Sequence, residues 1–164
     1  MKQMPSAWLA LRSLAWTIAI PGMVAGFIPW NYFGIGRMAI HLDDPMHLAG
    51  LACIAAGAAL LGACIVEFAR SGKGTLSPAD PPRELVVRGL YRYVRNPMYL
   101  AVTMIVLGEA VWARSWALFW YWMFFFACCN AFVMGYEEPY LRSRFGASYD
   151  AYAGRVGRWI PRMP

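Results

Sequence analysis

Four apolar runs, each about long enough to cross a lipid bilayer, constrain this chain more than any other feature. They cover residues 8–32, 46–69, 97–113 and 115–136. A helix needs about 20 apolar residues to cross the hydrocarbon core, where water is not available to unpaired backbone groups. We therefore expect an all-α integral membrane protein with about four transmembrane helices, folded as a single membrane domain over residues 1–164.

The composition agrees with a lipid environment. Of the 164 residues, 60% are hydrophobic and 15% are charged, whereas soluble domains carry about 25% charged residues. Eight Trp, nine Tyr and nine Phe are typical of chains whose rings lie where hydrocarbon meets headgroups. The four cysteines fall inside apolar runs without CxxC spacing, so we expect buried, reduced packing residues and no metal site.

The first apolar run contains Pro21 and Pro29, which predict a kink or an early end. A signal peptide is the alternative for this run, but the bulky segment 30–33 that follows resembles an interfacial belt more than a cleavage site. The second run follows Asp44 and Pro45 and is rich in Gly and Ala, which allow close helix approach in lipid. Only Arg114 and its neighbours separate the last two runs, which predicts a tight antiparallel hairpin.

Basic residues predict the orientation, because they collect in short cytoplasmic loops. They gather in the loop 70–96 and the tail 137–164, at Arg70, Lys73, Arg83, Arg88, Arg92 and Arg95, and at Arg142, Arg144, Arg155, Arg158 and Arg162. Lys2 and Arg12 place the N-terminus on the same side, while the other side holds only Arg37 and Arg114. Both termini are therefore expected in the cytoplasm. Anionic membrane lipids explain the net charge of +6 without a nucleic-acid partner.

Polar groups gather at the predicted cytoplasmic ends of the last two helices. Arg95 and Asn96 precede Pro97, where a helix N-terminus offers unpaired N–H groups to a carboxylate or phosphate. Glu137 and Glu138 follow the fourth run. The tail then predicts an amphipathic helix, broken at Gly146, that lies on the membrane surface or closes over the site. Its apolar face consists of Leu141, Phe145, Tyr149, Tyr152 and Val156.

The segments 88–99, with Gly-Leu-Tyr-Arg-Tyr-Val-Arg-Asn-Pro-Met-Tyr, and 137–152, with Glu-Glu-Pro-Tyr-Leu-Arg-Ser-Arg-Phe-Gly, resemble the isoprenylcysteine carboxyl methyltransferase and phospholipid methyltransferase superfamily. The resemblance covers roughly residues 70–161. It implies a membrane enzyme, in the inner membrane of a bacterium, that transfers a methyl group from S-adenosylmethionine to a lipidic or amphipathic acceptor. S-adenosylhomocysteine would be the product, formed at the cytoplasmic ends of the last two helices.

The resemblance also implies site residues. The family's Arg-His-Pro-x-Tyr element falls on Arg95, Asn96, Pro97 and Tyr99, and its paired glutamates fall on Glu137 and Glu138. We expect catalytic roles for Arg95, Asn96 and Glu138. Asn96 stands where many relatives have His, and an amide cannot take a proton near neutral pH, so a general base at this position is in doubt.

Charge and shape suggest how these residues would hold the cofactor. Its amino group suits Glu137 or Glu138, and its carboxylate suits Arg95 or helix N–H groups. Its adenine suits an aromatic face such as Tyr91 or Tyr93.

The acceptor site is less defined in the sequence. Asn130, Glu67 and Arg142 are candidates to contact the acceptor, whereas Glu109 lies about 20 Å along the helix from Asn96 and is too far from the cofactor for contact. A prenylated cysteine, a phospholipid amine, a small thiol and a hydrophobic metabolite all stay open as acceptors. Membrane lipids are expected partners, and a chain this small could form a homodimer.

Two other functions stay open at this stage. Glu109 and Glu67 would suit a small proton-coupled transporter in which an intramembrane carboxylate binds a cation. A membrane oxidoreductase of the steroid-reductase type has similar terminal helices, and binding of a nicotinamide cofactor would distinguish it.

Overall fold

The computed structural model describes residues 19–37, 41, 43–71, 85 and 87–162, and it is all-helical over these ranges. The expected helix over residues 8–18 and the loop over 72–84 lie outside the described residues. The elements in chain order are η1 (Met23–Phe27), α2 (Ile28–Tyr32), η2 (Ile35–Arg37), α3 (Pro45–Ser71), η3 (Gly89–Arg92), α4 (Pro97–Trp112), α5 (Trp116–Phe132), η4 (Val133–Glu137), α6 (Glu138–Phe145) and α7 (Ala147–Arg155).

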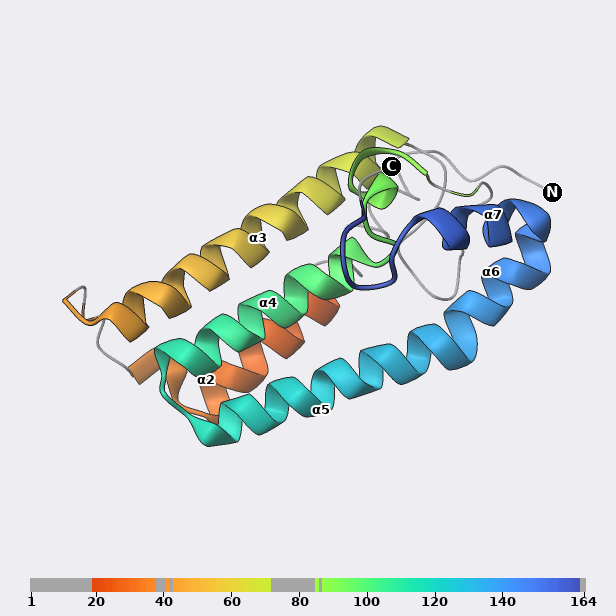
Figure 1. The fold of residues 1–164 in the computed structure, drawn as a ribbon. Coiled ribbons are helices and arrows are strands. Elements are labelled where there is room, and N and C mark those ends of the chain that lie inside the picture. Colours follow the sequence, from red (N-terminus) through yellow and green to blue (C-terminus); the bar gives the residue numbers. More distant parts are fainter. Residues whose placement is uncertain (1–18, 38–40, 42, 72–84, 86, 163–164) are drawn as a thin grey trace, which may run out of the picture.

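Three long helices form the body of the molecule, with α4 between α3 and α5 (Figure 1). The chain reverses direction from each long helix to the next. The short η1 and α2 lie beside α4 near the α4–α5 turn, while α6, α7 and the chain around η3 gather at the opposite end. This second end carries the polar segments that the sequence singles out.

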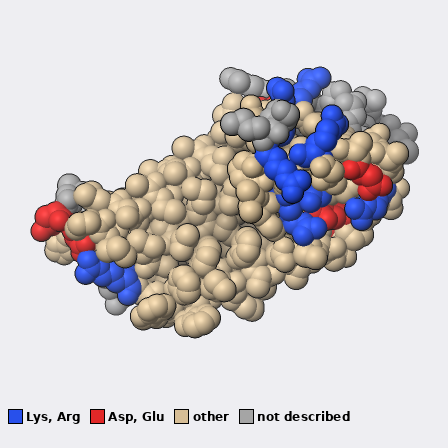
Figure 2. Space-filling view, in the orientation of Figure 1, with Lys and Arg blue, Asp and Glu red and all other residues tan. Residues whose placement is uncertain are grey.

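The described chain has two helical stretches long and apolar enough to cross a membrane, Pro45–Glu67 and Trp116–Phe145. The helix α4 is equally apolar in character but shorter, with 16 residues. Figure 2 shows charged side chains at both ends of the visible face and an uncharged surface between them. These features confirm an all-α fold with two helical stretches long and apolar enough to cross a membrane. The count of four spans and the cytoplasmic placement of the termini stay predictions.

Small residues allow α3 and α4 to touch through their backbones, as the second apolar run predicts. A Cβ atom placed on Gly108 would lie 2.8 Å from the carbonyl oxygen of Gly50 and from the backbone nitrogen of Ile54. A Cβ on Gly57 would lie 2.8 Å from the carbonyl oxygen of Ala101. These separations leave no room for larger side chains, so the glycines set the distance between the two helices.

The α4–α5 hairpin is as tight as the sequence predicts. Arg114 adopts a positive φ of 48° at the turn, and the Ser115 side chain accepts a hydrogen bond from the backbone of Leu118 to cap α5. The Arg114 side chain donates to both oxygens of Asp44, at 2.6 and 2.5 Å. Asp44 also accepts a hydrogen bond from the backbone of Met46 at the start of α3. The hairpin is thereby tied to the beginning of α3.

Two prolines distort helices that the sequence predicts to kink or end. A π-helical turn ends at Phe27, two residues before Pro29, and a second ends at Glu137, two residues before Pro139. Proline has no N–H to donate, and a π turn shifts the hydrogen-bond pattern so that the helix continues past it. The predicted end near Tyr136 is therefore wrong, because the helix continues as α6 to Phe145.

The tail helix breaks at Gly146, as predicted, where φ is +52°. One expectation about the cysteines needs correction. Cys64 and Cys129 are buried, but Cys128 is exposed on α5, because adjacent helical residues point about 100° apart and only one of the pair faces α4.

Candidate functional site

The C-terminal tail folds back onto the segment that precedes α4. The backbone N–H of Arg95 donates to Gly157 at 2.9 Å, and the N–H of Arg162 donates to Tyr93 at 2.9 Å. Val94 and Gly157 form an isolated parallel bridge. These bonds bring together two parts of the chain that are about sixty residues apart in sequence.

An aromatic cluster holds α7 against the same segment. Tyr149, Tyr152 and Val156 are buried together, with Leu85 and Phe145 among the residues packed on them. The Tyr152 hydroxyl donates to the carbonyl oxygen of Tyr91 at 2.7 Å. Burial raises the pKa of both Tyr149 and Tyr152, so both hydroxyls stay neutral and act through hydrogen bonds. The predicted apolar face of the tail thus closes over this end of the molecule.

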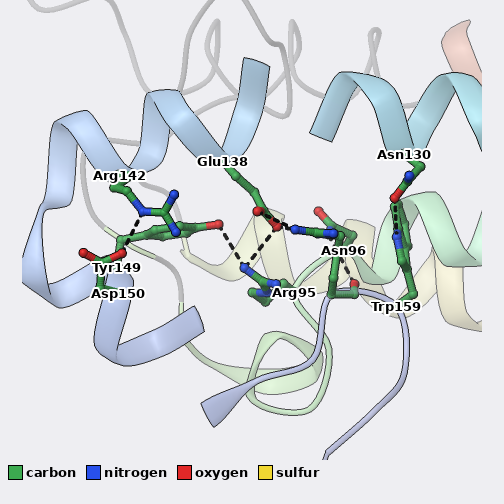
Figure 3. Close-up of polar contacts among 9 residues, drawn as sticks. Arg95, Asn96, Asn130, Glu138, Arg142, Tyr149, Asp150 and Trp159 are labelled. Atoms are coloured by element: carbon green, nitrogen blue, oxygen red, sulfur yellow. Dashed lines mark hydrogen bonds and ion pairs between the residues drawn. The ribbon is translucent and has the colours of Figure 1, made fainter. Parts of the chain in front are cut away.

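Glu138 lies at the centre of the charged contacts (Figure 3). Arg158 donates to both of its oxygens, from Nε at 2.7 Å and from Nη2 at 2.8 Å. Nη1 of Arg95 lies 3.0 Å from Oε1 of the same carboxylate and 3.3 Å from the Tyr149 hydroxyl. The hydrogen bond with Glu138 raises the pKa of Arg158. Two guanidinium groups around one carboxylate leave this centre with a net positive charge.

Arg95 still has capacity to bind another group. Its Nε is buried and has no hydrogen-bond partner among the described residues. A buried, unpaired donor on a charged group is unfavourable. This atom is where an additional acceptor, such as a carboxylate, would be stabilised.

Asn96 links the start of α4 to the tail. It is the residue before the first turn of α4, and its side chain does not cap that helix. Its Nδ2 instead donates to the carbonyl oxygen of Arg158 at 3.2 Å. Pro97 occupies the first turn and is fully buried. Asn96 therefore acts here through hydrogen bonds that position the chain carrying Arg158.

The second glutamate points to different partners. Glu137 accepts a hydrogen bond from the Tyr99 hydroxyl at 3.2 Å. Nearby, Asn130 accepts a hydrogen bond from the indole N–H of Trp159 at 2.9 Å (Figure 3), and Trp159 also packs near Tyr99 with ring centroids 6.5 Å apart. The adjacent carboxylates therefore have different partners: Glu137 contacts Tyr99, whereas Glu138 contacts Arg95 and Arg158.

The other predicted site residues are less central. A Cβ on Gly89 would lie 2.6 Å from the Glu67 carboxyl group, so Glu67 lies against η3. Tyr93 is 41% exposed. Arg142 is exposed and pairs with Asp150 at 2.8 Å. The structure brings these residues to the same end of the molecule as Glu138.

Three residues around Glu138 and Asn130 are missing from the predicted site. The sequence marks Arg158 only as part of the basic tail and Tyr149 only as part of an apolar face, and no sequence pattern singles out Trp159. The signal that could have found Arg158 is a basic residue close to buried tail positions, but sequence spacing does not show which carboxylate it meets.

Comparison with known proteins identifies the family of this chain. A profile described as phospholipid methyltransferase matches residues 45–148, well over half of the chain and including Arg95, Asn96, Glu137 and Glu138. The chain belongs to the phospholipid methyltransferase family. The match runs from the start of α3 into α7, so it contains the α4–α5 hairpin and both motif segments, and it ends before Arg158.

Individual relatives agree with this membership. The chain is 36% identical over 86 residues to "Protein-S-isoprenylcysteine O-methyltransferase" of Schizosaccharomyces pombe, covering 49% of this chain and 34% of that protein. It is 30% identical over 119 residues to "Protein-S-isoprenylcysteine O-methyltransferase B" of Arabidopsis thaliana, covering 68% and 57%. An uncharacterised protein of Haemophilus influenzae is 36% identical over 64 residues, covering 38% of this chain and all of that protein. The chain thus spans between a third and three fifths of the length of the two named methyltransferases.

Proposed function

We propose that this family member transfers a methyl group from S-adenosylmethionine to a lipidic or amphipathic acceptor at the cytoplasmic face of the membrane. The supporting observation is the charged centre formed by Arg95, Glu138 and Arg158, which lies beside the first turn of α4. The family membership favours methyl transfer over the transporter and reductase functions.

The residues of the charged centre suit a methyl donor that carries an amino acid group. The Nε–H of Arg95 would donate a hydrogen bond to the carboxylate of the methyl donor, and Glu138 would face its ammonium group. The N–H groups of the first turn of α4 add partial positive charge near the same carboxylate. When bound, the sulfonium of the donor supplies an activated methyl group.

The protein's contribution to transfer would be alignment and exclusion of water. The tail, held by Tyr152 and by the backbone bonds of Arg95 and Arg162, covers the end of the bundle. A closed, dry site holds the acceptor atom in line with the methyl carbon. The bound donor would supply the methyl group to the acceptor atom and would keep the electron pair of the broken carbon–sulfur bond on its sulfur.

The residues present favour an acceptor that needs no base. Asn96 cannot accept a proton near neutral pH, and its Nδ2 already donates to the backbone of Arg158. A carboxylate or thiolate attacks without losing a proton, whereas an ammonium group must first be deprotonated. We therefore propose a carboxylate or thiolate acceptor, carried on an apolar chain, ahead of a phospholipid amine.

Calorimetric titration of S-adenosylhomocysteine into the detergent-solubilised protein tests this proposal. We expect binding to the wild type and at least about ten-fold weaker binding to Arg95→Ala and Glu138→Gln, because each loses a charge-assisted hydrogen bond. Arg155→Ala and Asp150→Asn remove exposed charges of the same kinds and serve as matched controls with unchanged affinity.

A folded wild-type protein that binds no S-adenosylhomocysteine at millimolar concentration would refute the proposal. Binding of a nicotinamide cofactor in the same assay would instead support the reductase function.

A further inference from the structure

The helix α4 is too short to cross a bilayer by itself. Its 16 residues extend over about 24 Å, whereas the hydrocarbon core is about 30 Å thick. Because a tight turn joins α4 to the start of α5, the missing length lies at the other end of α4, before Pro97. Non-helical backbone at this depth is tolerated only where its polar groups are paired or buried in protein.

The chain that pairs with this end of α4 comes from the tail. We call residues 157–162 the tail turn. The hydrogen bonds described above between this turn and residues 93–96 pair polar groups of both segments. Pro161 has no N–H that would need a partner. A Cβ on Gly157 would overlap the carbonyl oxygen of Ile160, so this glycine allows the turn to be tight. The backbone of the tail turn is therefore suited to a site without water.

Trp159 shows how deep the tail turn reaches. Its indole contacts Asn130, and its ring centroid lies 5.2 Å from that of Phe126. Asn130 comes 14 residues after Trp116 in α5, or about 21 Å along the helix. Trp116 is an exposed ring at the start of α5, where aromatic residues mark the edge of the hydrocarbon. Asn130 therefore lies about 9 Å inside the opposite edge.

Ile160 follows Trp159 directly and is 78% exposed. Neighbouring Cα atoms are about 4 Å apart, so Ile160 lies within the same hydrocarbon layer as Trp159. Figure 3 shows Trp159 beside Asn130, on the side away from the exposed pair Arg142 and Asp150. An isoleucine side chain that the protein leaves uncovered at this depth gains free energy by contact with lipid chains.

We propose that the tail turn is embedded in the bilayer, with Ile160 in contact with lipid hydrocarbon, and that it completes the short span of α4. The partner of this surface is the hydrocarbon of the leaflet beside the candidate site. The tail turn also carries Arg158, so insertion of Ile160 helps to hold Arg158 against Glu138. The proposal concerns membrane contact and does not depend on methyl transfer.

Nitroxide accessibility in nanodiscs of phosphatidylcholine and phosphatidylglycerol measures the depth of the tail turn. The label is attached to Ile160→Cys in a Cys128→Ala background, because Cys128 is exposed, and signal from the remaining cysteines is measured on that background alone. Trp120→Cys on α5 is the reference for hydrocarbon, and the exposed Asp43→Cys is the reference for water. We expect the label at 160 to collide with oxygen as at 120, and to be at least about ten-fold less accessible to a nickel chelate than at 43.

Limited digestion with trypsin in the same nanodiscs, read by mass spectrometry, tests the effect on the tail. Ile160→Asp places a charge in hydrocarbon, so the tail turn should leave the bilayer and cleavage after Arg158 should become at least about ten-fold faster. Ala151→Asp adds the same charge at an exposed position of α7 and should be cleaved at the wild-type rate.

Two results would overturn the proposal. A label at 160 that is as accessible to nickel as at 43, while the label at 120 contacts oxygen, would show that the bilayer thins around α4 instead. Cleavage of Ile160→Asp at the wild-type rate would show that lipid contact does not hold the tail turn in place.

Discussion

Arg158 of the tail contacts both Glu138 on α6 and Asn96 at the start of α4. Its guanidinium group donates to both oxygens of Glu138, and its carbonyl oxygen accepts a hydrogen bond from Asn96. Glu138 is buried, with 7% of its surface exposed. Without Arg158, Arg95 is the one remaining ion-pair partner of the Glu138 carboxylate among the described residues, so the carboxylate would be held less firmly and its charge would be less well compensated.

We expect Arg158→Ala to lower the free energy of unfolding by about 1–3 kcal/mol, the usual effect of removing hydrogen bonds to a buried charged group. The affinity for S-adenosylhomocysteine should fall in the same variant, because Glu138 is no longer held in position. Arg158→Lys restores the charge but not the two-pronged contact, so it should recover only part of the affinity. Unfolding in detergent and calorimetry measure the two effects.

Arg155→Ala is the matched control for this prediction, since Arg155 is exposed and its Nε donates to the backbone carbonyl oxygen of Ala151. Normal affinity in Arg158→Ala would show that Arg158 does not position Glu138 for the cofactor.

The contact between α3 and α4 depends on the small size of the residues in it. Gly50 and Gly108 face each other with their backbones nearly in contact. In lipid, helices associate through such close packing and not through exclusion of water. The two long helices therefore depend on these glycines for their separation, and α4 depends on α3 for its position beside α5.

Gly108→Ala should destabilise the protein by about 1–3 kcal/mol, the typical cost of overpacking, because the added methyl group meets backbone atoms of α3. Gly62→Ala is the control in the same pair of helices. Apart from its own helical turn, no heavy atom of the described residues lies within 4 Å of a Cβ at Gly62, and alanine favours helix, so this change should be neutral or slightly stabilising. Thermal unfolding of both variants in detergent compares them. Equal melting temperatures would contradict the close-packing interpretation.

Across the whole molecule, charged side chains are unevenly distributed along the long axis of the helix bundle. On the face that Figure 2 shows, charged side chains collect at both ends, and basic side chains cover more of the end that holds the candidate site. Cytoplasmic loops attract such an excess of basic residues, and S-adenosylmethionine is made in the cytoplasm. The charge distribution and the proposed cofactor therefore favour the same orientation.

We expect a reporter fused after Pro164 to lie in the cytoplasm. A fluorescent protein that folds only in the cytoplasm should be bright there, and alkaline phosphatase, which is active only outside it, should be inactive. The same reporters fused after Asp43, just before α3, should give the opposite result. Active phosphatase at the C-terminus would reverse the proposed orientation and place the charged centre on the wrong side for the cofactor.

Much of the fold was predictable because it follows from local patterns. Apolar runs of bilayer length predict α3, α4 and α5, Asp44 and Ser115 mark helix starts, and Gly146 marks the break in the tail. The continuation of α5 into α6 was not predictable in this way. Pro139 normally ends a helix, and only the π turn before it allows the chain to continue.

The sequence by itself determined the membrane environment, the hairpin and the clustering of Arg95, Asn96, Glu137 and Glu138 at one end of the bundle, because periodicity, charge and motif order are local properties. The tertiary structure alone decided that Arg158 holds Glu138, that Trp159 contacts Asn130, and that Glu109 and Trp112 line the same pocket. These pairings join residues far apart in the chain, so they depend on how the tail and the N-terminal helices pack against α4 and α5, which no local pattern specifies.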